Sequence, residues 1–238
     1  MKNIYPFIIT LMSGLSTIIG YLSIYTKKNK EKIIKNALSL AAGTMTCISI
    51  IELIPESILL LKKQYIYLVI SIIIGMTLPL IIEKTTKKTK SLYKIGILSM
   101  IAIIIHNIPE GIITYITTIS NEKLGITIAL AIALHNIPEG ISIAIPIYYA
   151  TNSKNNAFKK VLISALSEPI GAILATHLQK HITNKIMGII LSFTAGIMTT
   201  ISIVVLMPEA LKYKEKKKTI VFFIIGILIM YISIKLTK

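Results

Sequence analysis

The six-residue sequence HNIPEG occurs twice in this chain, beginning at His106 and again at His135. Both copies stand inside stretches that are otherwise almost entirely isoleucine, alanine and leucine. In each copy the glutamate follows the histidine by four residues, as Glu110 follows His106 and Glu139 follows His135. Residues four apart lie on one face of an α-helix, so each helix would present an imidazole and a carboxylate to the same point.

The composition indicates an integral membrane protein. Of the 238 residues, 54% are hydrophobic and the mean hydropathy is +0.76, which is too apolar for a soluble domain. A helix needs about 20 apolar residues to cross a hydrocarbon core of about 30 Å, and eight segments are candidates, the last of which is the shortest. We therefore predict an all-α polytopic bundle of eight transmembrane helices that forms a single domain over residues 1–238. The helices are expected at about residues 4–26, 36–61, 64–82, 95–119, 124–150, 161–179, 185–211 and 219–234.

The charge distribution sets the expected orientation of these helices. All 26 basic residues are lysines and all ten acidic residues are glutamates, which gives a net charge of +16. Eighteen lysines fall in or beside the connections that follow the first, third, fifth and seventh expected helices, and eight fall elsewhere. Because lysine-rich loops stay in the cytoplasm, this split predicts that both termini lie outside. The charge therefore favours contact with anionic membrane lipids, and no nucleic acid partner is expected.

A second pair of segments also repeats. AGTMTCISIIELIPE, from Ala42, and AGIMTTISIVVLMPE, from Ala195, match at ten of fifteen positions. They fall in the second and seventh expected helices, which cross the membrane in opposite directions, as do the two helices with HNIPEG. This predicts a 3+2+3 inverted repeat, an arrangement typical of secondary transporters with a site near the middle of the bilayer. No phosphate-binding loop of the type GxxxxGK[ST] is present, so the chain carries no ATP-driven motor of its own.

The residues of the two motifs point to a metal site. Charged side chains at the depth of the bilayer usually mark the path of an ion or substrate, although a lone one can simply bond to a neighbouring helix. Pro109 and Pro138 should kink the helices, and the glycine that ends each motif allows another backbone or an ion to approach closely. A third carboxylate, Glu168, stands in SALSEPIGA of the sixth expected helix. Imidazole, carboxylate and amide ligands without thiolate suit Zn²⁺, Fe²⁺, Mn²⁺ or Co²⁺, and three carboxylates would balance most of the charge of two such ions.

Together these motifs resemble the ZIP family of divalent-metal transporters. The matching features are two HNxPEG elements in adjacent helices, AAGxM followed by PE, SEPxGA, and AGIM followed by PEA. The resemblance is closest to the bacterial zinc-uptake, ZupT-like branch and covers nearly the whole chain. It implies a transporter, not an enzyme, that imports Zn²⁺ across the plasma membrane into the cytoplasm, with Fe²⁺, Mn²⁺, Co²⁺ and Cd²⁺ as further substrates. The metal is then cargo, and no cofactor is implied.

By motif position, the resemblance implies a binuclear site. The first ion would be held by His106, Glu110, His135 and Glu139. The second would be held by Asn107, Glu110, Asn136, Glu139 and Glu168, with two of the glutamates bridging. Met45, which follows AAG in the second helix, can approach the first ion in this family; the alternative for Met45 is a thioether in the core.

Several polar residues are left with open roles. Glu56 and Glu209 occupy matching places in the repeat and would either line entrance and exit vestibules or extend to the membrane surface as helix-end glutamates. Glu52 aligns with Val205, and the sequence offers no reason for this break.

The sequence leaves two alternative roles for each of two histidines outside the motifs. His177 and His181 either collect metal at the outer end of the sixth helix or form an exposed polar turn. Cys47 is the only cysteine, which excludes a disulfide within the chain and a CxxC metal site.

The mechanism that follows is alternating access, in which one group of helices shifts against another around the metal site. The rival from another class is an intramembrane metal-dependent hydrolase, but such enzymes commonly show HExxH, and here asparagine follows each histidine. A metal-responsive receptor is a second rival. Whether the chain forms a homodimer is left open.

Overall fold

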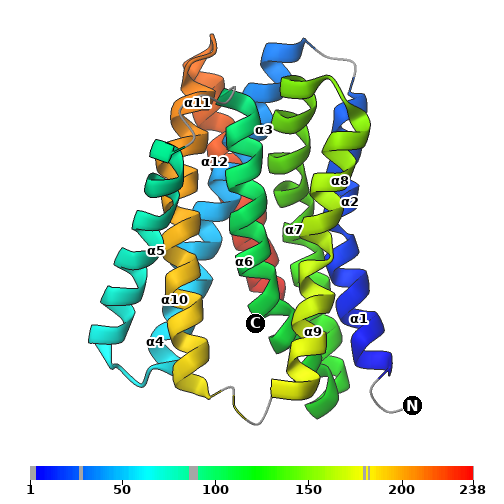
Figure 1. Ribbon diagram of the computed structural model, residues 1–238, viewed down its shortest axis with the longest axis vertical. Helices are drawn as coiled ribbons and strands as arrows, with labels where there is room; N and C mark the ends of the chain where they lie inside the picture. The colour runs from blue at the N-terminus through cyan, green and yellow to red at the C-terminus, as the bar shows by residue number, and fades with distance from the viewer. Residues whose placement is uncertain (1–3, 27–28, 86–90, 179–180, 182, 238) are drawn as a thin grey trace.

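The computed structural model describes residues 4–26, 29–85, 91–178, 181 and 183–237. These residues form helices joined by short connections, with no strand among them, which confirms the all-α class (Figure 1). The helices are α1 (Ile4–Leu15), α2 (Thr17–Tyr21), η1 (Leu22–Tyr25), α3 (Lys30–Ile48), η2 (Ser49–Leu53), α4 (Ile54–Leu60), α5 (Tyr65–Thr85), α6 (Ser91–Ser120), α7 (Glu122–Thr151), α8 (Lys154–Ala165), α9 (Ser167–Leu178), α10 (Asn184–Thr200), η3 (Ile201–Leu206), α11 (Met207–Leu211) and α12 (Lys216–Thr237).

Most of the expected membrane spans are present as long apolar helices. Within the described residues, seven stretches are long and apolar enough to cross a membrane: Ile4–Tyr25, Lys30–Leu60, Tyr65–Ile82, Leu92–Ser120, Glu122–Thr151, Asn184–Leu211 and Lys216–Lys235. The remaining expected span, 161–179, corresponds to the end of α8 and to α9, which are separated at Leu166. Figure 1 shows that α8 and α9 together run the height of the bundle beside the other helices.

Two helices begin earlier than the hydropathy pattern indicates. α3 starts at Lys30 rather than near residue 36, because the Asn29 side chain accepts a hydrogen bond from the Glu31 N–H. α8 starts at Lys154 rather than near residue 161, because the Ser153 hydroxyl accepts one from the Asn156 N–H. Capping side chains therefore set these two boundaries, several polar residues before the apolar stretch begins.

Two of the spans contain π-helical turns just before a proline. Ser49–Leu53 precedes Pro55, and Ile201–Leu206 precedes Pro208. Proline lacks an N–H and clashes with the carbonyl four residues earlier, and the wider π turn relieves both problems. These turns fall at matching positions of the predicted repeat, and Figure 1 shows α3 beginning at the end of the bundle where α11 finishes. The two segments thus run in opposite directions, while the 3+2+3 inverted repeat as a whole stays a prediction.

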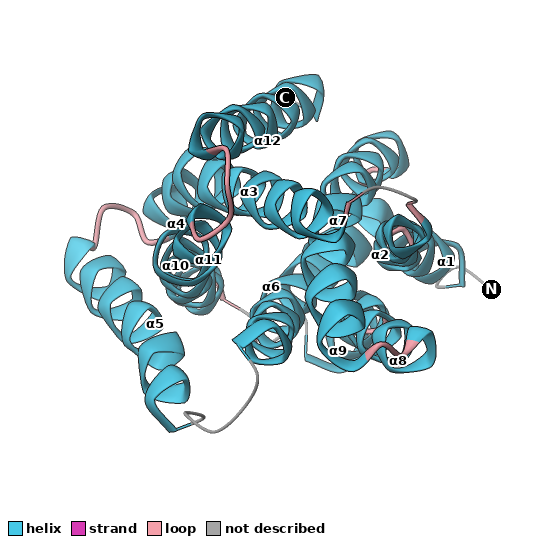
Figure 2. Cartoon of the chain, turned by 90° about the horizontal axis from the view of Figure 1, so that it is seen from above, coloured by secondary structure: helices cyan, strands magenta, loops and turns pink. Residues whose placement is uncertain are grey.

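The helices pack as two groups (Figure 2). The first group is α1, α2, η1, α6, α7, α8 and α9, and the second is α3, η2, α4, α5, α10, η3, α11 and α12. A Cβ atom added at any of the twelve glycines would meet its nearest neighbours within the same group, as Gly75 of α5 would at 2.0 Å from the Phe193 carbonyl oxygen of α10. The tightest glycine contacts therefore lie within the groups, which meet each other through contacts such as those of α3 with α7 and of α10 with α6.

Candidate metal site

Three helices of the first group carry the residues that the sequence singles out. α6 and α7 each continue as one helix through the proline of its HNIPEG motif. Glu168 lies in the first turn of α9. The glycine that ends the α6 motif allows this proximity, since a Cβ at Gly111 would lie 2.0 Å from the Glu168 carbonyl oxygen. Gly171 acts in the same way, because its Cβ would lie 2.2 Å from the Ile108 carbonyl oxygen. Close backbone packing therefore places Glu168 against the motif of α6.

The centre of the site is the carboxylate of Glu110. Its Oε1 atom lies 3.0 Å from His106 Nε2 and 3.1 Å from His135 Nε2. Glu139 joins the cluster from α7, with Oε1 at 3.9 Å from His106 Nε2. Potential ligand atoms of His106, Glu110 and His135 all lie within 4.8 Å of one another, and no other His, Cys, Asp or Glu group in the described part of the chain meets this condition. The predicted convergence of the two motifs is thus present.

A second set of contacts lies next to this centre. The side chain of Asn136, the residue after His135, donates hydrogen bonds from Nδ2 to Glu168 Oε1 and to the Ser13 carbonyl oxygen, the latter at 3.1 Å. Asn107 is buried beside His106 on α6. Sequence reasoning missed the Ser13 carbonyl, because a backbone ligand or acceptor leaves no signature in the residue type.

All seven predicted ligand residues are buried, with at most 8% of any residue exposed. Each has at least one buried side-chain atom with no hydrogen-bond partner among the residues that the structure describes. These atoms are His106 Nδ1, Asn107 Nδ2 and Oδ1, Glu110 Oε2, His135 Nδ1, Asn136 Oδ1, Glu139 Oε2 and Glu168 Oε2. A buried polar group without a partner costs about 1–3 kcal/mol, and more when it is charged. A bound divalent cation would supply the missing partners and offset the buried negative charge.

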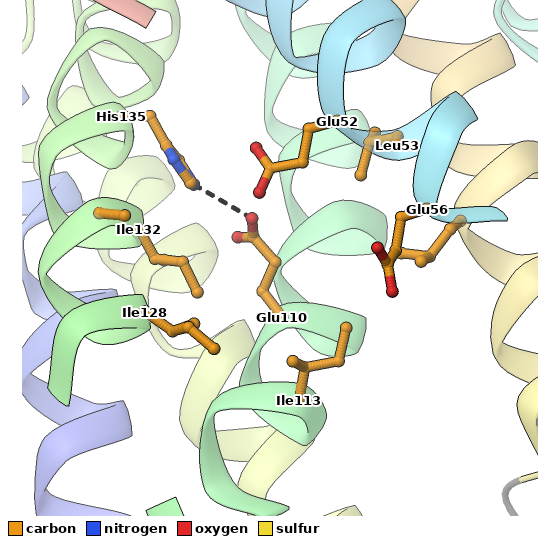
Figure 3. A pocket seen from close by; sticks show the side chains of 10 residues that line it. Glu52, Leu53, Glu56, Glu110, Ile113, Ile128, Ile132 and His135 are labelled. Atoms are coloured by element: carbon orange, nitrogen blue, oxygen red, sulfur yellow. Dashed lines mark hydrogen bonds and ion pairs between the residues drawn. The ribbon is translucent and has the colours of Figure 1, made fainter. Parts of the chain in front are cut away.

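A cavity of about 250 Å³ reaches the site from one side. Glu110 and His135 stand at its inner end, and Glu52, Glu56 and several isoleucines complete its lining (Figure 3). The α7 residues that line it, such as Ile128, precede the motif prolines and glutamates and lie in the half of the helix nearer Glu122. The cavity therefore opens toward the end of the bundle where α1 and α7 begin, which is the lysine-poor end.

Three other candidate residues from the sequence, Met45, His177 and His181, lie outside the cluster around Glu110. Met45 is buried in α3. His177 is exposed, with Nδ1 2.7 Å from the Thr176 hydroxyl and 3.0 Å from the Ile173 carbonyl oxygen of its own helix. His181 is exposed as well.

The two glutamates at matching places of the repeat differ in their surroundings. Glu209 is buried and pairs with Lys212 at 2.6 Å, whereas Glu56 is exposed and lines the cavity. Glu52, whose role was left open above, lines the same cavity.

Comparison with known proteins adds independent findings. Residues 86–234, more than half of the chain, match the family described as ZIP zinc transporter. The chain is 35% identical over 277 aligned positions to the zinc transporter ZupT of Clostridium perfringens (strain 13 / Type A), covering 99% of this chain and 97% of the relative. It is 37% identical to the zinc transporter ZupT of Streptococcus mutans serotype c (strain ATCC 700610 / UA159), over 97% and 96% of the two chains. It is also 37% identical to the zinc transporter ZupT of Chlorobaculum parvum (strain DSM 263 / NCIMB 8327), over 98% and 97%.

Proposed function

This chain belongs to the ZIP zinc transporter family, and from that premise we propose that it is a secondary transporter that imports Zn²⁺ through the site between α6, α7 and α9. One observation carries the proposal. Seven buried side chains of these helices each keep a polar atom without a hydrogen-bond partner among the described residues, and two of them, Glu110 and His135, line a cavity. The family consists of zinc transporters, which argues against an intramembrane hydrolase.

We propose that the site holds two ions. His106, Glu110, His135 and Glu139 would bind the first, and Asn107, Glu110, Asn136, Glu139 and Glu168 the second. The contacts of Glu110 with both histidines, and of Asn136 with Glu168, support two neighbouring half-sites. Fe²⁺, Mn²⁺, Co²⁺ and Cd²⁺ accept the same ligand types and are proposed as further substrates.

These ligand types suit a site that binds a metal ion and then releases it, rather than a site that holds the ion permanently. A transport site must replace the hydration shell of the ion and yet release the ion on the other side. Neutral imidazole and amide ligands lower the total negative charge compared with a cage of thiolates or carboxylates alone. Protons compete with the metal for histidine and glutamate, so affinity should fall in acid.

The direction of transport follows from the charge distribution and the cavity. We propose that the lysine-poor end, with both termini, faces the outside of the plasma membrane, and that the lysine-rich end contacts anionic lipids in the cytoplasmic leaflet. The cavity then opens to the outside. A shift of the first group of helices against the second would close this cavity and open a path to the cytoplasm.

Uptake of radioactive Zn²⁺ by cells that express the full chain tests the proposal. We expect Glu110→Gln and Glu139→Gln to abolish uptake while surface expression is retained. Glu122→Gln, which removes a carboxylate from the start of α7 away from the cavity, is the matched control and should transport like the unmodified chain. Uptake that survives Glu110→Gln would contradict the proposed site.

A further inference from the structure

The two matching segments of the second and seventh spans differ in one chemically important way. Glu52 stands in the π-helical turn of the second span, and its match Val205 stands in that of the seventh. Val205 is 8% exposed, and the matching glutamate one turn on, Glu209, is buried and paired with Lys212. The carboxylates on the lysine-poor side therefore line a cavity, while the lysine-rich side has an apolar side chain and an ion pair.

The cavity holds carboxylates at three depths. Glu56 is exposed, Glu52 is partly buried and Glu110 is buried, and all three line it. Figure 3 shows the Glu52 carboxylate directed toward Glu110 and His135, with Glu56 farther along the same helix. The remaining lining is mostly apolar, as at Ile113, so a cation inside has few other groups to contact.

A cluster of carboxylates alone would not indicate a ligand. Here the inner member, Glu110, also has a buried oxygen, Oε2, that makes no hydrogen bond within the described residues. The cavity thus leads to a buried carboxylate atom that lacks a protein partner, which is the condition that a passing cation would satisfy.

We propose that Glu52 and Glu56 form an outer metal subsite, at which a hydrated divalent cation is held before Glu110 and His135 bind it. This inference rests on the proposed function and adds a site outside the two motifs. The outer subsite belongs to the second group of helices, whereas Glu110 and His135 belong to the first. A shift between the groups therefore separates the cation from Glu52 once it is bound by the inner ligands.

The test is the initial rate of Zn²⁺ uptake by cells at a series of external Zn²⁺ concentrations, normalised to surface expression. Removing one partly buried charge should weaken binding about tenfold, so Glu52→Gln should raise the half-saturating concentration about tenfold without lowering the maximal rate. Glu52→Asp keeps the charge and should fall between Glu52→Gln and the unmodified chain. Glu56→Gln should have a smaller effect that disappears at high ionic strength, because its carboxylate is exposed and its field is screened.

Glu122→Gln serves as the control for loss of one carboxylate on the same side of the bundle, and its half-saturating concentration should not change. The inference is overturned if Glu52→Gln transports with an unchanged half-saturating concentration, or if only its maximal rate falls. Failure of the proposed function gives a different result, since the unmodified chain would then show no saturable Zn²⁺ uptake at any concentration.

Discussion

Glu110 places a buried carboxylate between two imidazoles, an arrangement that requires compensation by positive charge. In the proposed function a bound divalent cation would supply that charge. Because Glu110 contacts both histidines, this carboxylate, rather than either histidine, links the two motifs.

A second charged residue, Glu215, gives a prediction for stability. Its carboxylate contacts Lys218 Nζ at 2.5 Å and the buried Lys35 Nζ at 3.0 Å. Hydrogen bonding to Lys218 and then to Lys35 lowers the pKa of Glu215 from 4.5 to about 2. Because the folded pKa is lowered, the stabilisation is fully present above pH 4.5 and is lost as the pH falls toward about 2.

We therefore expect Glu215→Gln to melt at a lower temperature than the unmodified protein above pH 4.5, with the difference shrinking toward about pH 2. Thermal unfolding of the purified protein in detergent, followed across this range, measures the difference. A difference that stays constant as the pH falls would show that the ion pairs do not cause it.

At the residue scale, the sequence predicted the candidate site residues that share a motif and missed those that depend on local geometry. The four-residue spacing puts His106 and Glu110 on one face of α6, and the packing of α7 against α6 brings His135 to them. Glu52 was left without a role, since the side to which it points depends on a π-helical turn that residue spacing does not reveal. Lys35 was expected beside a loop, yet it is buried inside α3 and paired with Glu215.

At the scale of the elements, the close approach of α9 to α6 positions Glu168, on which the second proposed ion site depends. A methyl group at Gly111 would meet the backbone of Glu168, which cannot move aside without shifting α9. We expect Gly111→Ala to lower the free energy of unfolding by about 1–3 kcal/mol and to weaken Zn²⁺ binding, although every ligand side chain is retained.

Gly96→Ala on the same helix is the matched control. Its Cβ would meet the buried Ile147 side chain at 2.6 Å, about four helical turns from Gly111, so it adds crowding on α6 away from the contact with α9. Equilibrium Zn²⁺ binding and chemical unfolding of the two variants measure the difference. Equal Zn²⁺ affinity in both would mean that the spacing of α6 and α9 does not control the site.

Element boundaries were the least predictable part of the fold. Hydropathy located the apolar middle of each span, but the polar first turns of α3 and α8 were assigned to connections because they contain lysine and asparagine. Pro109 and Pro138 lie inside α6 and α7, each of which continues as one helix, and the expected kinks stay a prediction. π-helical turns, which the residue pattern did not indicate, stand before Pro55 and Pro208.

For the whole molecule, the all-α class and most of the spans could be predicted from the hydropathy along the chain, and seven of the described stretches are long and apolar enough to cross a membrane. The one-sided cavity could not be predicted in this way. Cavity access depends on how the two groups of helices lie against each other. The sequence predicts two alternative arrangements and does not say which is more stable. In the structure, access is from the lysine-poor end.

This one-sidedness can be tested with cysteine labelling. In a Cys47→Ser background, Ile128→Cys lines the cavity and should react with a membrane-impermeant thiol reagent added outside intact cells, more slowly when Zn²⁺ is in excess. Val205→Cys is the matched control at a buried position of the opposite half and should not react from outside. Reaction of Ile128→Cys only in inside-out vesicles would reverse the proposed orientation.

The central claim is that the two HNIPEG motifs bind the metal, and X-ray absorption at the zinc edge of the purified, Zn²⁺-loaded full chain tests it most directly. We predict nitrogen and oxygen ligands at about 2.0–2.1 Å with imidazole scattering beyond them. This scattering should disappear in His106→Ala/His135→Ala and persist in His177→Ala/His181→Ala. Imidazole scattering that survives the first pair of substitutions and is lost in the second would contradict the account.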